Sequence, residues 1–136
     1  MNLQIYRIVS LSLAVIFGVV GLVFLLFSAN ILEIFNTVSI RLGMQEGSAA
    51  GANLYVALAV SYMYLVALLA YLMYRNPLHR DYPFLLMNGK LASAALSVGL
   101  FVAVQPLLIY IVNGVVDGSI GVLAAMMYSR AKKEST

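Results

Sequence analysis

Residues 85–125 read LLMNGKLASAALSVGLFVAVQPLLIYIVNGVVDGSIGVLAA, two apolar segments on either side of the turn Val104-Gln105-Pro106. Each segment is interrupted by one charge, Lys90 in the first and Asp117 in the second. Apolar runs of about 20 residues are long enough to cross the hydrocarbon core of a bilayer as helices. Because so short a turn makes the two helices antiparallel neighbours, the stretch predicts a membrane-embedded helical hairpin with one charge on each helix.

The composition extends this interpretation to the whole chain. Of its 136 residues, 63% are hydrophobic and 10% are charged, with a mean hydropathy of +0.98. A soluble domain averages about 45–50% apolar and about 25% charged residues. We therefore predict an all-α fold, an integral membrane four-helix bundle that forms one transmembrane domain over residues 1–136 and runs up, down, up and down. The predicted spans are about 5–28, 53–74, 82–104 and 106–128, followed by a cytoplasmic tail at 129–136.

The first span is a nearly continuous apolar run from Ile8 to Phe27. A cleaved signal peptide is the rival interpretation of this run. The run is longer than the usual apolar region of about 7–15 residues in such peptides, and a cut after Ala29 places bulky Phe27 where a small residue is needed. A transmembrane helix is therefore favoured.

The connection between the first two spans is the longest in the chain. Its apolar residues recur at helical spacing, which predicts an amphipathic helix on the membrane surface. They are Ile31, Ile34, Phe35, Val38 and Leu42. This helix is either a lid or partner surface, or a plain interfacial connector. The small residues from Gly47 to Ala52 form either a flexible link or a close-packed first turn of the next helix.

Lys90 and Asp117 are expected to pair within the membrane. At 1.5 Å per residue they lie about 12 Å and about 16 Å from the cytoplasmic ends of their helices, a difference that a lysine side chain spans. Each charge alone costs about 2.5–3.5 kcal/mol at mid-bilayer on insertion scales. Pairing removes much of that cost, so each residue explains the presence of the other.

Further polar and small residues share the helix faces of this pair. Ser93 and Ser97 follow Lys90 at i+3 and i+7, and Asn113 precedes Asp117 by one turn. In the second span, Tyr62 and Tyr64 lie near mid-membrane, where at least one hydroxyl needs a polar partner inside the bundle. Small residues suited to close helix packing are Gly89, Gly114 and Gly118. The cluster is either a structural lock of the hairpin or the wall of a wet cavity.

The basic residues predict the orientation of the chain. An inside N-terminus places six of them on the cytoplasmic face and only Arg41 outside, which is the positive-inside pattern. The inside group is Arg7, Arg75, Arg80, Arg130, Lys132 and Lys133. Both termini of this cell-membrane protein are therefore expected in the cytoplasm, and the span number must be even.

Motifs for catalysis are lacking, so an enzyme is not expected. Gly89-Lys90 is no phosphate loop because Leu91 stands where Ser or Thr is required, and the chain contains no cysteine and one histidine, His79. No cofactor, metal or nucleic-acid partner is expected. We predict an interaction, assembly or accessory subunit in contact with membrane lipids and with a protein partner or further copies of itself. The alternative is a transporter-like, lipid-binding or small-molecule-binding protein built on Lys90 and Asp117.

Overall fold

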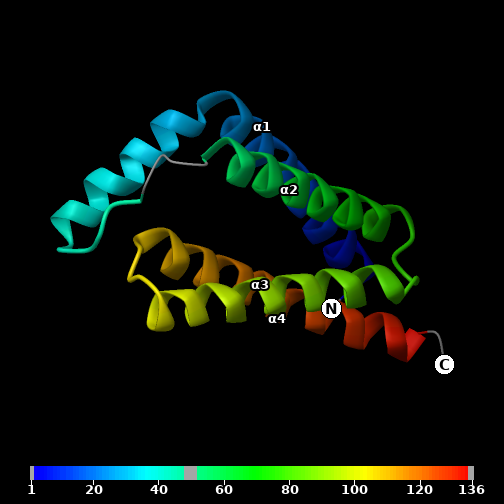
Figure 1. Cartoon of the computed structure of the whole chain (residues 1–136). Helices are drawn as coiled ribbons and strands as arrows, with labels where there is room; N and C mark the ends of the chain where they lie inside the picture. Colours follow the sequence, from blue (N-terminus) through cyan, green and yellow to red (C-terminus); the bar gives the residue numbers. More distant parts are fainter. Residues whose placement is uncertain (1, 48–51, 135–136) are drawn as a thin grey trace.

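The structure is a computed structural model that describes residues 2–47 and 52–134. Within these residues the chain forms four α-helices: α1 (Leu3–Arg41), α2 (Ala52–Arg75), α3 (Asp81–Ala103) and α4 (Leu108–Glu134). Each of these helices is long and apolar enough to cross a membrane. The predicted all-α fold with four membrane helices is confirmed (Figure 1).

The helix ends lie close to the predicted spans, with two exceptions. At one of them, α4 continues to Glu134, so most of the predicted tail at 129–136 is helical. At the other, α1 continues to Arg41, so the segment expected to form an amphipathic helix is helical and makes up the last part of α1. The predicted linker of small residues lies largely at 48–51, outside the described residues.

Helix α1 is divided by a kink at Phe27, which has non-helical torsion angles of φ −127° and ψ 30°. Its 39 residues correspond to about 58 Å of helix, roughly twice the thickness of the hydrocarbon core. The kink lies where the apolar run gives way to Ser28-Ala29-Asn30, in which serine and asparagine favour the helix interior less than alanine or leucine does. Figure 1 shows the second part of α1 bending away from the direction of the first.

The helices form two hairpins. Helix α1 packs mainly against α2, and α3 packs mainly against α4, whereas the contacts between the hairpins are fewer. Helix α3 starts directly after the turn that contains Pro77, with Asp81 in its first turn, where a carboxylate is favourable for the helix dipole. Figure 1 shows the α1–α2 hairpin lying across the α3–α4 hairpin. The architecture is therefore a pair of packed hairpins.

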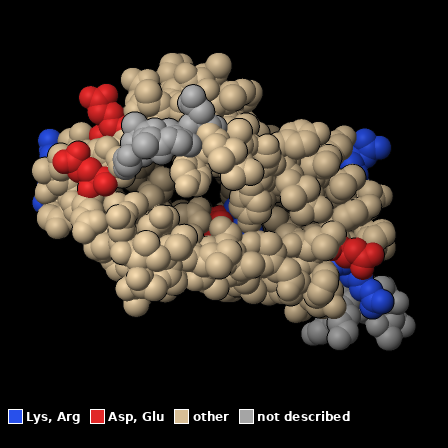
Figure 2. All heavy atoms as spheres, viewed as in Figure 1, with Lys and Arg blue, Asp and Glu red and all other residues tan. Residues whose placement is uncertain are grey.

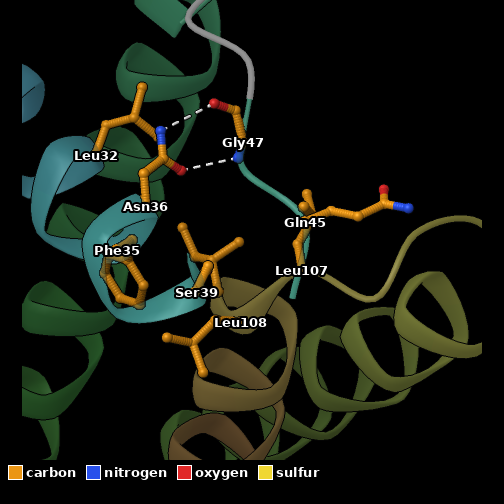
Figure 3. A pocket seen from close by; sticks show the side chains of 9 residues that line it. Leu32, Phe35, Asn36, Ser39, Gln45, Gly47, Leu107 and Leu108 are labelled. Atoms are coloured by element: carbon orange, nitrogen blue, oxygen red, sulfur yellow. Dashed lines mark hydrogen bonds between the residues drawn. The ribbon is translucent and has the colours of Figure 1, made fainter. Parts of the chain in front are cut away.

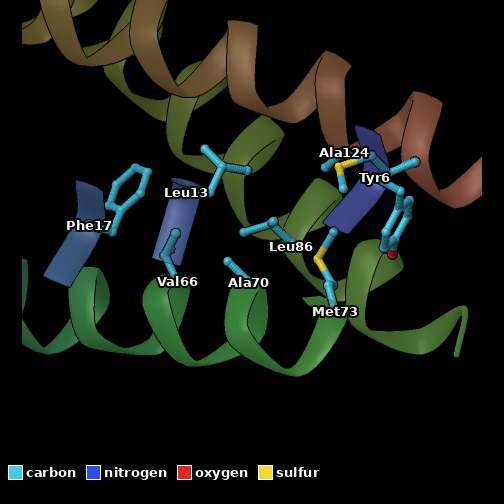
Figure 4. Close-up of a cluster of buried hydrophobic side chains, with 9 residues drawn as sticks. Tyr6, Leu13, Phe17, Val66, Ala70, Met73, Leu86 and Ala124 are labelled. Carbon is cyan, nitrogen blue, oxygen red and sulfur yellow. The ribbon is translucent and has the colours of Figure 1, made fainter. Parts of the chain in front are cut away.

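All four helices contribute to one apolar core, part of which Figure 4 shows in close-up. Its buried members are Tyr6, Leu13 and Phe17 of α1, Val66, Ala70 and Met73 of α2, Leu86 of α3, and Ala124 and Met127 of α4. The three core residues of α1 all lie before the kink. The core therefore joins the two hairpins over the first part of α1.

The second part of α1 ends in a local cap that contacts the start of α4. Gly43, at φ +68°, ends the helix in a left-handed conformation that glycine adopts without strain. The Asn36 side chain holds the chain that follows, because its amide nitrogen donates to Gly47 O at 3.2 Å and its oxygen accepts from Gly47 N at 2.8 Å (Figure 3). Gln45 pairs with Leu107 through an isolated bridge. These contacts enclose a cavity of about 20 Å³, enough for about one water molecule.

Candidate functional site

The candidate site lies midway along α3 and α4, where Lys90 Nζ is 2.6 Å from Asp117 Oδ1. Both side chains are almost completely buried, with 1% and 4% of their surfaces exposed. An ion pair withdrawn from water is tolerated when close geometry offsets the cost of desolvation. The pair therefore acts as one neutral unit that joins α3 to α4.

The ammonium group of Lys90 is also enclosed by the other hairpin. Its Nζ lies 4.2 Å from the centre of the Phe17 ring in α1 and 4.8 Å from the centre of the Tyr62 ring in α2. A cation held over an aromatic face is stabilised by about 2 kcal/mol or more when water is excluded. Lys90 therefore contacts residues of the other three helices. It links α3 to α4 within one hairpin, and it links this hairpin to the α1–α2 hairpin.

One turn from Asp117, Asn113 makes a second polar link between α4 and α3. Its amide nitrogen donates to Ser97 Oγ at 2.7 Å and to Ser93 Oγ at 3.2 Å. Interhelical hydrogen bonds inside membrane proteins average about 0.6 kcal/mol each. The structure therefore brings Lys90, Ser93, Ser97, Asn113 and Asp117 together on the facing surfaces of α3 and α4.

The two mid-span tyrosines face opposite directions. Tyr62 is turned inward, where its hydroxyl lies 3.7 Å from the position that a Cβ on Gly89 would occupy. Tyr64 has 68% of its surface exposed and lies outside the cluster. Two residues apart on a helix is a rotation of about 200°, so both side chains cannot face the same interior. We call the group of interior polar side chains the polar cluster. It consists of Tyr62, Lys90, Ser93, Ser97, Asn113 and Asp117.

Two buried oxygen atoms of the polar cluster have unused hydrogen-bonding capacity. Asp117 Oδ2 and the Tyr62 hydroxyl have no hydrogen-bond partner of sound geometry among the described residues. The Tyr62 hydroxyl lies near Ser93 and Asp117 without forming a hydrogen bond to either. Chemically, the cluster can hold a charge and offers one carboxylate oxygen as a hydrogen-bond acceptor.

The glycines of α4 let α3 approach closely, each to a different degree. A Cβ at Gly118 would meet Ala94 Cβ at 3.7 Å, an ordinary contact, and one at Gly114 would meet Val98 Cγ2 at 3.2 Å. A Cβ at Gly121 would lie 2.7 Å from Leu91 Cδ2 and 2.9 Å from Leu91 Cγ. The closest approach of the two helices is therefore at Gly121.

Sequence reasoning missed Phe17 as a member of the site. Phe17 is one of many apolar residues in the first span, and nothing in its spacing distinguishes a ring that contacts Lys90 from a ring that contacts lipid. The described residues also contain no group of three or more His, Asp or Glu side chains placed to hold a metal ion.

These observations define the class of the protein as a small all-helical membrane bundle with a buried polar cluster. Comparison with protein-family models, with curated proteins and with solved structures finds no match for the chain.

Proposed function

We propose that the protein is an assembly or accessory subunit of the cell membrane that docks on a transmembrane helix of a partner through the outward face of α3. One observation carries the proposal: this face is lined by small residues and is exposed along its whole length. We call it the outer α3 face. It consists of Asn88, Ala92, Ala95, Gly99 and Ala103, all of them exposed.

The spacing of these residues places them on one side of the helix. Successive steps of 4, 3, 4 and 4 residues keep all five within about 80° around the helix axis. A Cβ built on Gly99 meets no atom within 4 Å, so none of the described residues fills the space beside it. Small residues on one face let helix backbones approach closely, and a polar amide such as that of Asn88 adds a hydrogen-bonding group to such interfaces.

The buried ion pair supports the same proposal. Because Lys90 and Asp117 are bound to each other and are covered by Phe17 and Tyr62, their charges are not offered to a substrate. Burial to this degree favours a structural role of the polar cluster over a transport pathway. The outer α3 face lies on the opposite side of α3 from Lys90, so docking there leaves the pair undisturbed.

Photocrosslinking tests the docking face directly. A benzoylphenylalanine at Ala95 is expected to yield a discrete protein adduct in the native membrane, whose mass reports a second copy or another protein. The matched control is Val115 in α4, which is 64% exposed and lies at about the same helical distance from the predicted cytoplasmic side. Here lipid adducts are expected. The Gly99→Leu variant is expected to fold normally and to abolish the Ala95 adduct. Equal adducts at Ala95 and Val115, or an Ala95 adduct unaffected by Gly99→Leu, contradict the proposal.

Orientation is the second part of the proposal, with both termini in the cytoplasm. It is supported by the excess of basic residues at the helix ends on that side. Single cysteines at Glu46 and at Asn76, both exposed positions, are expected to react with a membrane-impermeant maleimide from opposite sides, Glu46 from outside. Reaction of both from one side of intact cells is incompatible with four spans.

A second candidate function is a small-molecule or lipid site beside Lys90 and Asp117. It is favoured by the hollow in the face of the molecule that Figure 2 shows, where acidic and basic atoms are visible at the floor. The unpaired Asp117 Oδ2 gives a ligand one acceptor. We rank this function second because the Lys90 and Asp117 side chains are only 1% and 4% exposed.

A further inference from the structure

We propose that the end of the bundle opposite the α3–α4 turn binds the headgroup of an anionic phospholipid. This inference is independent of the docking role of the outer α3 face. The site is an open hollow of about 530 Å³ between the start of α1 and the turn that joins α2 to α3. Figure 1 shows these two segments at the same end of the molecule.

The polar part of the lining is basic. Arg7, Arg75 and His79 surround the hollow together with the amide of Asn76. Arg7 has no carboxylate within 4 Å among the described side chains, and Arg75 donates from Nη1 to the Tyr71 hydroxyl at 3.2 Å. Two guanidinium groups without an acidic partner match a phosphate, whose oxygens accept pairs of hydrogen bonds from arginine. We call this site the basic hollow.

His79 is held in place by its neighbours on α3. Its ring stacks on Tyr82 at 4.4 Å between ring centres, and its Nδ1 lies 3.8 Å from Asp81 Oδ2. Asp81 thus faces the histidine rather than either arginine. The ring is therefore pre-oriented at the edge of the hollow, and the positive charge of the two arginines is left available to a ligand.

The remaining lining distinguishes a lipid from a free anion. Leu3, Pro77 and Leu78 form the apolar part of the basic hollow, and Leu3 and Leu78 are 38% and 53% exposed. Inorganic phosphate fills a small part of such a volume, and it has no apolar surface to bury against the leucine side chains. A phospholipid places its phosphate between the arginines and its glycerol and upper acyl carbons against the leucines.

The position in the chain agrees with this ligand. Arg75 is the last residue of an apolar helix, and Arg7 lies one turn after the start of another, so both guanidinium groups are placed at the level of lipid headgroups. Basic pockets between helices on the cytoplasmic side of membrane proteins bind anionic headgroups through these same forces.

Lipid titration of the full-length protein tests the proposal. The protein is purified in a neutral detergent and titrated with phosphatidylglycerol, and the bound fraction is measured by native mass spectrometry. We expect one tightly held phosphatidylglycerol molecule. The double variant Arg7→Gln/Arg75→Gln is expected to bind it on the order of 30-fold more weakly, since each basic residue near the surface contributes about fivefold.

A matched double variant controls for loss of net charge. Arg41→Gln/Arg80→Gln removes the same two charges from exposed positions that do not line the basic hollow, and it is expected to bind phosphatidylglycerol like the wild type. An equal loss in both double variants overturns the proposal, as does equal binding of zwitterionic phosphatidylcholine. Displacement of the lipid by millimolar inorganic phosphate assigns the hollow to a free anion instead. Thermal unfolding of each variant checks the fold, and Arg75→Gln alone replaces the double variant if that protein is unstable.

Discussion

Replacing Lys90 by methionine, or Asp117 by leucine, is expected to remove most of the folded protein, whereas the double replacement restores it. The single change at Lys90 leaves the buried carboxylate of Asp117 with neither oxygen paired, and the change at Asp117 leaves an ammonium between two aromatic rings. Removing one partner of a buried ion pair costs about 3–5 kcal/mol, and replacing both by apolar residues is often neutral or stabilising.

The measurement is the yield of monodisperse protein after size exclusion in detergent, together with the thermal midpoint of unfolding. Single variants that fold as well as the wild type show that the pair contributes nothing to stability. The double variant also separates the two candidate functions. If it folds, forms the crosslink at Ala95 and complements a deletion strain, Lys90 and Asp117 are structural. If it folds and forms the crosslink but fails to complement a deletion strain, the polar cluster carries the activity.

Gly121→Ala is expected to destabilise the α3–α4 hairpin by about 1–3 kcal/mol, the usual cost of forcing an extra methyl group into a packed core. The new Cβ would lie 2.7 Å from Leu91 Cδ2 and 3.3 Å from the Leu91 backbone nitrogen, so turning the leucine side chain relieves only part of the overlap.

Gly118→Ala is the matched control, three residues earlier on the same helix. Its Cβ meets Ala94 Cβ at 3.7 Å, and alanine is the better helix former, so its stability is expected to equal or exceed that of the wild type. Thermal unfolding followed by circular dichroism in detergent measures both. A Gly121→Ala protein as stable as Gly118→Ala contradicts the close approach of α3 and α4 at Leu91.

The number of helices and their approximate limits were predictable because long apolar runs leave no other stable arrangement in a membrane. Lys90 and Asp117 were recognisable as interior residues because each charge is too costly to leave alone in lipid. By contrast, the kink at Phe27 was not predicted. It has neither a proline nor a glycine to mark it, and the lower helix propensity of Ser28 and Asn30 is too small a signal to place a kink.

The sequence also did not predict which side of each apolar helix faces the core and which side faces lipid. In a soluble protein, polarity separates the inner from the outer side of a helix, but lipid and core are equally apolar, so Phe17 carried no signal that it contacts Lys90. The same ambiguity affected Tyr64, which faces outward. The sequence alone does not show which side of α3 packs against α4. In the structure α4 lies on the opposite side of α3, which leaves the small residues of the outer α3 face exposed.

The 27 residues that separate Lys90 from Asp117 also constrain how the chain enters the membrane during synthesis. At about 5–20 residues per second, the ribosome adds Asp117 about 1–5 s after Lys90. Helix α3 alone therefore carries an unpaired charge, and it gains a neutral interior only when α4 arrives beside it. Entry of α3 and α4 into lipid as one unit avoids the cost of about 2.5–3.5 kcal/mol that a single charge has at mid-bilayer. The rings of Phe17 and Tyr62, synthesised earlier, are then already present to receive the ammonium group.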